Sequence, residues 1–272
     1  MSKNINMTNM YRTILLALPA LLLLAACADD VTTPAEPADT LAGQPVRFTA
    51  TGLAITPADA PRTRATQGTD FPAEGSTMTV YMTGDGNTWQ ADYTYNETNS
   101  TWNAEGTPLY WPASTGNYTF TAISPAGTST HINLPVEWTE EDMTKWEKVR
   151  ATYEAERVSP STSPISLTLR HALVKVVVQS PSSFVYLTEA PYAGDINLQD
   201  GNTSGLATIF IKLLKGGNDN THTGYILPPA ASFQVLTEDN IYEVSNTIKD
   251  DSGNDKTISA GTSVTIELNT QP

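Results

Sequence analysis

Short segments in which apolar and polar residues alternate make up most of the chain, and this pattern restricts its fold more than any other feature. In residues 44–55, Val46, Phe48 and Ala50 alternate with polar neighbours, which is typical of a strand with one buried face. Similar segments recur at 77–82, 93–95, 118–123, 131–136, 167–178, 207–214, 224–226, 232–236, 241–247 and 263–268. Gly, Pro, Asn or Ser residues bound them and end strand pairing. The pattern predicts an all-β chain with antiparallel sandwich architecture.

One segment has the helical period instead. Its apolar residues return to one face every three or four positions: Met143, Trp146, Val149 and Tyr153. Thr139 and Asp142 can cap its start. The sequence therefore predicts a helix from about 140 to 157. The Ser- and Pro-rich residues 158–166 end it and mark a domain boundary.

The N-terminus has the composition of an export signal. Lys3 and Arg12 precede an apolar run at 14–26, which is too short to cross a bilayer but has the length of a signal-peptide core. Residues 24–27, Leu-Ala-Ala-Cys, resemble the lipobox of bacterial lipoproteins. This resemblance implies that Cys27 receives lipid and becomes the mature N-terminus. An ordinary signal peptide with a chance cysteine is the alternative.

The sequence after the signal suggests a tether and a folded body. Residues 27–43 carry Pro, Thr and acidic residues without hydrophobic periodicity, as in a flexible stalk. The acidic residues after Cys27 resemble surface-export signals of outer-membrane lipoproteins. A single cysteine excludes an intrachain disulfide. The formal net charge of −14 opposes nucleic-acid binding.

Length and composition predict two β domains after the stalk. The expected organisation is a signal peptide at 1–26, the stalk at 27–43, an N-terminal β-sandwich at 44–160 and a C-terminal β-sandwich at 161–272. A short helical segment is expected between the two sandwiches.

Three groups of motifs together resemble the fimbrillin family. They are Trp89, Trp102, Tyr-Trp-Pro at 110–112 and Phe-Thr-Ala-Ile-Ser-Pro at 120–125; Leu-Thr-Leu-Arg-His-Ala-Leu at 167–173; and the strand region 257–268. The resemblance covers most of the chain after the stalk, and the order and spacing of the motifs carry it. It implies two tandem transthyretin-like β-sandwich domains and a role as a type V pilus subunit, exported as a lipoprotein.

The resemblance also implies assembly by exchange of strands between subunits. Loss of the first strand of a sandwich exposes an apolar groove and unpaired backbone groups, which a strand from another subunit can satisfy. In the family, cleavage after an arginine starts this step. Arg62 and Arg64 follow the candidate strand at 44–55, and Arg64 is the preferred site. Two unprocessed arginines in a polar loop are the alternative, and stalk, tip and anchor roles stay open.

The sequence offers little for catalysis. His131, His171 and His222 have no catalytic or zinc-ligand spacing, and His171 is interpreted as a hydrogen-bonded core residue. The acidic residues 250–255 lack the spacing of an EF-hand, so a solvated turn is favoured over a calcium site. The chain is predicted to be neither an enzyme nor a cofactor or metal protein.

The predicted function is a surface-anchored lipoprotein of the outer membrane that acts as a pilus subunit or adhesin. Its partners would be other pilus subunits through strand exchange, the outer membrane through the lipid on Cys27, and a ligand on a host or bacterial surface. The alternative is a tethered glycan-binding lipoprotein, in which exposed tryptophans stack on sugars. The candidates are Trp89, Trp102, Trp111 and Trp138, for which a core position is the favoured interpretation.

Overall fold

The fold is taken from a computed structural model and is almost entirely β. The structure describes residues 41–57, 71–152, 156–199, 202–217, 220–228, 232–244, 247–249 and 255–268. Within these residues no helix combines the length and the apolar character that a membrane crossing requires.

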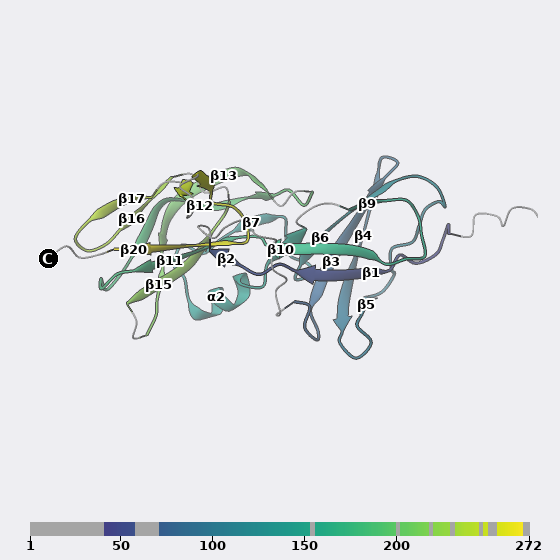
Figure 1. Cartoon of the computed structure of the whole chain (residues 1–272), viewed down its shortest axis with the longest axis horizontal. Coiled ribbons are helices and arrows are strands. Elements are labelled where there is room, and N and C mark those ends of the chain that lie inside the picture. The colour runs from purple at the N-terminus through teal and green to yellow at the C-terminus, as the bar shows by residue number, and fades with distance from the viewer. Residues whose placement is uncertain are drawn as a thin grey trace, which may run out of the picture. The chain divides into compact units, whose positions relative to one another are not determined.

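An eight-stranded sheet contains most of the described strands between residues 48 and 171 (Figure 1). Its main path runs β1-β10-β8-β6-β3-β4-β5, and β9 pairs with β6. The strands are β1 (Phe48–Gly52), β3 (Thr77–Gly84), β4 (Asn87–Asn96), β5 (Thr101–Ala104), β6 (Tyr118–Ser124), β8 (Arg150–Thr152), β9 (Glu156–Val158) and β10 (Ile165–His171).

Two five-stranded sheets and a small ribbon contain the other described strands. One sheet has the order β14 (Leu214–Lys215), β15 (Thr221–Ile226), β11 (Val174–Gln179), β20 (Thr262–Glu267) and β2 (Thr56–Pro57). The other has the order β13 (Thr203–Lys212), β12 (Tyr186–Ile196), β16 (Phe233–Leu236) and β17 (Ile241–Val244), with β7 (His131–Asn133) paired to β12. The ribbon joins β18 (Thr247–Lys249) and β19 (Asp255–Thr257).

The all-β sandwich class predicted from the sequence is confirmed, but the sheets are mixed rather than purely antiparallel. Three of the described pairings are parallel: β1 with β10, β11 with β20, and β2 with β20. Parallel neighbours cannot be joined by a tight hairpin and need a long connection. Each of these pairs joins segments that are distant in the sequence, so local alternation could not reveal their direction.

The predicted helix at 140–157 is correct at its start and wrong in its length. Helix α2 spans Glu140–Trp146, and Thr139 and Asp142 form the capping box. The chain then turns and continues as β8 and β9. In β8, residues 150–152 pair with β10, and residues 150 and 151 also pair with β6. Because this segment completes the sheet between two strands, sheet pairing outweighs the local helical period.

Two hydrophobic clusters form the interior of the described structure. The first core cluster includes Phe48, Tyr93, Trp111, Phe120 and Leu167, and the second includes Ile132, Trp138, Val176, Tyr225 and Phe233. Segments on either side of residue 160 enter both: residues 165–169 belong to the first cluster, and residues 132–151 contribute to the second. The domain limits at 44–160 and 161–272 remain a prediction.

Gly224 in β15 offers a direct test of packing in the second core cluster. A Cβ atom at this position would lie 2.7 Å from Leu213 Cδ2 and 2.8 Å from Cδ1 and Nε1 of the Trp138 ring. Overpacking of this kind commonly costs about 1–3 kcal/mol. We therefore expect Gly224→Ala to lower the free energy of unfolding by that amount in urea titrations.

Gly217 supplies the matched control, because a Cβ there would meet no atom within 4 Å. Gly217→Ala should leave the urea midpoint nearly unchanged. Equal stability of the two variants would show that the Trp138 ring is not packed against β15 as described.

Candidate functional site

Residues 41–57, here called the edge segment, lie along the edges of two sheets. Within this segment, β1 is the end strand of the eight-stranded sheet and runs parallel to β10 (Figure 1). A few residues later, β2 is the end strand of a five-stranded sheet and runs parallel to β20. Between them, the Leu53 N–H donates to the Leu169 carbonyl at 2.7 Å. One short segment therefore completes the hydrogen bonding of two sheet edges.

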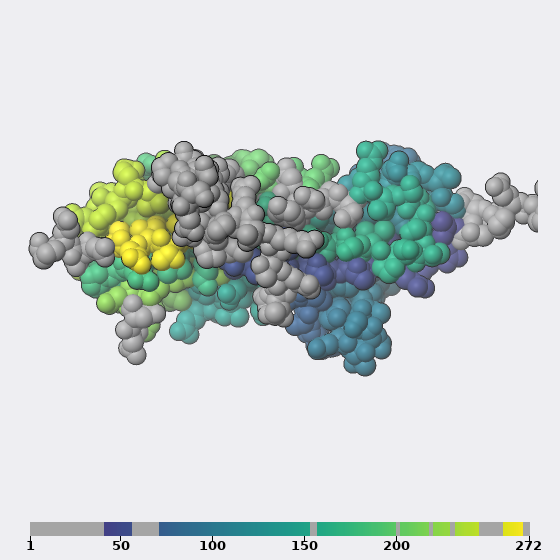
Figure 2. Space-filling view, viewed as in Figure 1, coloured from purple at the N-terminus to yellow at the C-terminus, as the bar shows by residue number. Residues whose placement is uncertain are grey.

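The side chains of the edge segment alternate between interior and solvent, as predicted from the sequence. Val46, Phe48 and Ala50 are at most 5% exposed, whereas Arg47 and Thr49 face solvent. Figure 2 shows that the segment, coloured purple, reaches the molecular surface. It is thus a surface strand whose inward side chains belong to the first core cluster.

Phe48 is the main anchor of the segment. Its ring makes edge-to-face contacts with Tyr93 and Phe120, with centroid distances of 5.1 and 5.7 Å. This is a favourable arrangement of aromatic quadrupoles. The Tyr93 hydroxyl accepts a hydrogen bond from the Leu109 N–H at 3.0 Å. The wall of the Phe48 site is therefore fixed by bonds that do not involve Phe48.

A second set of backbone bonds fastens the start of the edge segment to residues 109–114. The Gly43 N–H donates to the Trp111 carbonyl at 2.8 Å, and the Trp111 N–H donates to the Gln44 carbonyl at 3.0 Å. The Ser114 hydroxyl accepts from the N–H groups of residues 41 and 42. Sequence reasoning missed these contacts. The Tyr-Trp-Pro motif stands out in the sequence, but nothing local in the sequence indicates which segment it pairs with.

The tryptophans proposed as sugar platforms in the glycan-binding alternative are mostly interior residues. Trp102, Trp111 and Trp138 are 8%, 1% and 2% exposed, and Trp89, partly buried, packs near Tyr118 at 6.4 Å. Their favoured interpretation as core residues is confirmed for the three buried rings. These three cannot offer an open face to a sugar.

The three histidines occupy separate environments. His131 is exposed, and its Nδ1 lies 2.9 Å from Asp195 Oδ1. His222 is buried, with Nε2 3.2 Å from the Ser182 carbonyl. His171, at the end of β10, is fully buried, and its ring stacks on Tyr225 at 5.2 Å. The structure does not bring the three together, and the predicted core role of His171 is confirmed.

The neutral state of His171 follows from its surroundings. Burial lowers the pKa of this imidazole to about 4, and the nearby Arg150 guanidinium acts in the same direction. Nε2 donates to the Glu147 carbonyl at 2.7 Å, and Nδ1 accepts from the Leu173 N–H at 3.3 Å. The ring thus joins the end of α2 to the turn between β10 and β11.

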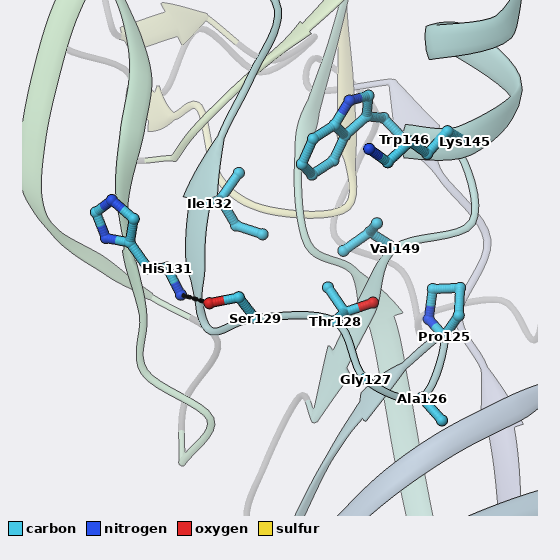
Figure 3. A pocket seen from close by; sticks show the side chains of 10 residues that line it. All are labelled: Pro125, Ala126, Gly127, Thr128, Ser129, His131, Ile132, Lys145, Trp146 and Val149. Atoms are coloured by element: carbon cyan, nitrogen blue, oxygen red, sulfur yellow. Dashed lines mark hydrogen bonds between the residues drawn. The ribbon is translucent and has the colours of Figure 1, made fainter.

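A pocket of about 330 Å³ is lined by residues 125–129, by the start of β7 and by residues at and after the end of helix α2 (Figure 3). Ile132, Trp146 and Val149 are among its apolar lining residues. In Figure 3 the ring of His131 stands apart from the other side chains, and its backbone N–H donates to the Ser129 hydroxyl. None of the lining residues is a carboxylate or a thiol. Among the described residues, no three His, Cys, Asp or Glu side chains are placed to hold a metal ion.

The sequence comparison decides the family. Residues 63–272 match the fimbrillin-like family. The chain belongs to this family. No curated protein matches the sequence at a significant level.

Several solved structures resemble this fimbrillin-like protein. A candidate cell adhesion protein from Bacteroides uniformis has a TM-score of 0.52 and 18% identity, over 83% of this chain and 93% of that chain. A candidate cell adhesion protein from Bacteroides ovatus gives 0.48 and 14%, over 83% and 93%. The tip fimbrial protein Mfa3 from Porphyromonas gingivalis, truncated at its C-terminus, gives 0.43 and 11%, over 84% and 96%. The first of these supports the fold assignment.

Several sites predicted from the sequence lie outside the described residues. They are the signal peptide at 1–26, Cys27, most of the stalk, Arg62 and Arg64. Residues 250–254 of the acidic loop also lie outside them. These predictions stay predictions.

Phe48 should contribute far more to stability than its exposed neighbour. Truncation of a buried aromatic ring commonly costs about 3–5 kcal/mol, so Phe48→Ala should lower the free energy of unfolding by several kcal/mol in urea. Arg47→Ala, at a solvent-facing position of the same segment, should change it by about 0.5 kcal/mol or less. Similar losses for both variants would contradict the described orientation of the segment.

His171 should make this fimbrillin-like protein less stable in acid. The unfolded imidazole titrates near 6.5 and the folded one near 4, so between these pH values the unfolded state binds more protons. Stability from the neutral ring is complete above about pH 6.5 and falls as the pH drops towards 4, by up to about 3 kcal/mol. Urea titrations across this range should show the loss.

The variant His171→Gln isolates this contribution, because a glutamine amide can still donate to the Glu147 carbonyl but does not titrate. Its free energy of unfolding should depend less steeply on pH between 4 and 6.5 than that of the wild type. Parallel pH profiles for the two proteins would show that His171 is not the neutral buried group described.

Proposed function

We propose that this fimbrillin-like protein is a surface-anchored pilus subunit or adhesin that assembles by β-strand exchange. The observation that carries the proposal is the position of the edge segment, which pairs with the edges of two sheets and is followed a few residues later by Arg62 and Arg64. The proposal includes the two β-sandwich domains at 44–160 and 161–272.

Removal of the edge segment would leave two kinds of unsatisfied surface. The outer edge of β10 would lose its backbone partners in β1, and the edge of β20 would lose those in β2. The sites of Val46, Phe48 and Ala50 would open as an apolar groove. Exposed edges and grooves of this kind favour pairing with another chain. A strand from a neighbouring subunit satisfies both at once, which is the principle of β-strand addition.

Cleavage at Arg64 would free the edge segment from the folded body, because the polypeptide would then be broken between the segment and β3. The same cut would separate the body from Cys27 and its proposed lipid. An uncut chain would stay tethered to the outer membrane through Cys27 and the stalk at 27–43. Processing therefore decides between an anchored protein and one released for incorporation into a fimbrium.

The adhesin part of the proposal rests on the family and on the fold shared with the candidate adhesion protein from Bacteroides uniformis. The burial of Trp102, Trp111 and Trp138 counts against the alternative in which these rings stack on sugars. A ligand on a host or bacterial surface would then be a partner alongside other pilus subunits.

Limited proteolysis of the full-length protein tests the release step. An arginine-specific protease should cut after Arg64 and give a fragment that begins at Ala65 while the rest of the body stays intact. Arg64→Lys keeps the charge but removes the cleavage site, so it should abolish this fragment and shift any cutting to Arg62. N-terminal sequencing identifies the cut, and SDS-resistant ladders report assembly.

Cutting throughout the folded body, or identical fragments from wild type and Arg64→Lys, would count against release at this site. A clean cut without ladders, in the presence of other subunits, would contradict assembly by strand exchange.

Lipid attachment has a separate test. Cells that express the protein should incorporate labelled palmitate into it, and the protein should fractionate with the outer membrane. Cys27→Ser should lose the label and leave the membrane fraction, because Cys27 is the only cysteine in the chain. Retention of label or of membrane association by this variant would refute a lipid anchor at Cys27.

A further inference from the structure

We infer that the groove occupied by residues 46–52 selects one side-chain pattern: aliphatic, any, aromatic, any, alanine, any, glycine. The inference rests on the proposed function and specifies its partner. The occupant is a strand that carries this pattern, runs parallel to β10 and comes from a different subunit rather than from β20 of a second copy.

The backbone register determines which side chains of an incoming strand face the groove. Phe48 lies opposite Ile165, Ala50 opposite Leu167 and Gly52 opposite Leu169. Because side chains alternate along a strand, an occupant that uses the same backbone partners points every second residue inward. A slip by one residue would turn all apolar groups to solvent. Four alternate positions of an incoming strand therefore place their side chains in the groove.

The second of these positions requires an aromatic ring. Phe48 fills a site walled by Tyr93 and Phe120, and the hydrogen bond from Leu109 to the Tyr93 hydroxyl holds that wall in place. A smaller side chain would leave a cavity, since close-packed walls relax only partly. The adjacent aliphatic position, Val46, is buried, and its N–H donates to the Leu109 carbonyl at 2.8 Å.

The fourth position requires glycine for a reason of space. A Cβ at Gly52 would lie 2.8 Å from Phe71 Cβ, closer than real Cβ atoms approach. The backbone of Gly52 is outside the left-handed region, so its conformation does not demand glycine. Phe71 cannot easily yield, because the near atom adjoins its backbone and its ring contacts both Trp102 and the Arg150 guanidinium. Phe71 is thus the residue that selects glycine.

The third position accepts only a small side chain. Ala50 is 5% exposed and lies opposite Leu167, which is fully buried. An aromatic ring in place of its methyl group would have to displace residues of the first core cluster.

The last described strand of the chain does not have the pattern. In β20 and the residue after it, alternate positions carry Val264, Ile266 and Leu268. An occupant with these residues would place isoleucine in the aromatic site and leucine in the alanine site. In the whole chain the full pattern occurs once, at residues 46–52. A second copy that offered β20 would therefore fit poorly.

The test uses full-length protein cut between residues 58 and 70, by the arginine-specific protease or through an inserted site for a second protease. A fluorescent peptide of residues 44–57 is exchanged into the cut protein and followed by anisotropy. We expect the wild-type peptide to bind. Peptides with Phe48→Ala, Ala50→Phe or Gly52→Ala should bind at least about tenfold more weakly.

Two controls test whether peptide binding depends on the side chains that face the groove. A Thr49→Phe peptide adds the same ring as Ala50→Phe on the solvent side and should bind within about threefold of wild type. A peptide of residues 259–268 should not compete. Phe71→Gly protein, which lacks the Cβ atom that a side chain at position 52 would meet, should recover binding of the Gly52→Ala peptide, as a double-mutant cycle requires for a direct contact. Equal binding of the Ala50→Phe and Thr49→Phe peptides, no recovery by Phe71→Gly, or competition by residues 259–268 would overturn the inference.

The same substitutions in the uncut chain separate this inference from the proposed function. Phe48→Ala, Ala50→Phe and Gly52→Ala should lower the midpoint of thermal unfolding by about 5 °C or more, and Thr49→Phe by much less. If these shifts appear but the wild-type peptide does not enter the cut protein, strand exchange is refuted while the side-chain preference stands. If the four variants unfold alike, the inference fails whatever the peptides do.

Discussion

The parallel pairing of β1 with β10 is the constraint on which the first half of the structure depends. It closes the edge of the eight-stranded sheet, places Phe48 between Tyr93 and Phe120, and positions Gly52 against Phe71. Backbone N–H and C=O groups at the edge of β10 would cost free energy if they were buried without partners. The edge segment therefore contributes both hydrogen bonds and apolar burial, and removal of the whole segment would take away both. For this reason a short segment is important to a large sheet.

The sequence predicted those features that depend on neighbours along the chain. The alternation of Val46, Phe48 and Ala50 gave the correct buried face, and Thr139 with Asp142 gave the correct start of α2. It failed where distant partners decide the outcome. Residues 150–152 lie within the segment predicted to be helical, but they form the strand between β6 and β10. Periodicity describes which face of a segment is apolar and carries no information about what the segment lies against.

The same limit applies to the candidate site. The first strand could be identified from its local pattern, whereas the residues that shape its site could not. Phe71 and Gly52 come together through the fold. In a sequence, a glycine required because there is no space for a Cβ atom looks the same as one required by backbone conformation. Only the positions of the neighbouring atoms distinguish these two reasons.

A strand that is held by many contacts can still be exchanged, because exchange replaces those contacts rather than losing them. While the chain is intact, the edge segment is tethered beside its groove, and its effective concentration there exceeds that of any free competitor. A cut after the segment removes this advantage without altering a single contact in the groove. Backbone hydrogen bonds to β10 would then be equal for every competing strand, so they cannot choose among them. In the proposed exchange, discrimination would fall to the side chains, and specificity would arise as much from poor fit of wrong strands as from good fit of the right one. The close approach of Phe71 to Gly52 is a feature of that kind, since it adds little to the binding of a glycine-containing strand and excludes others.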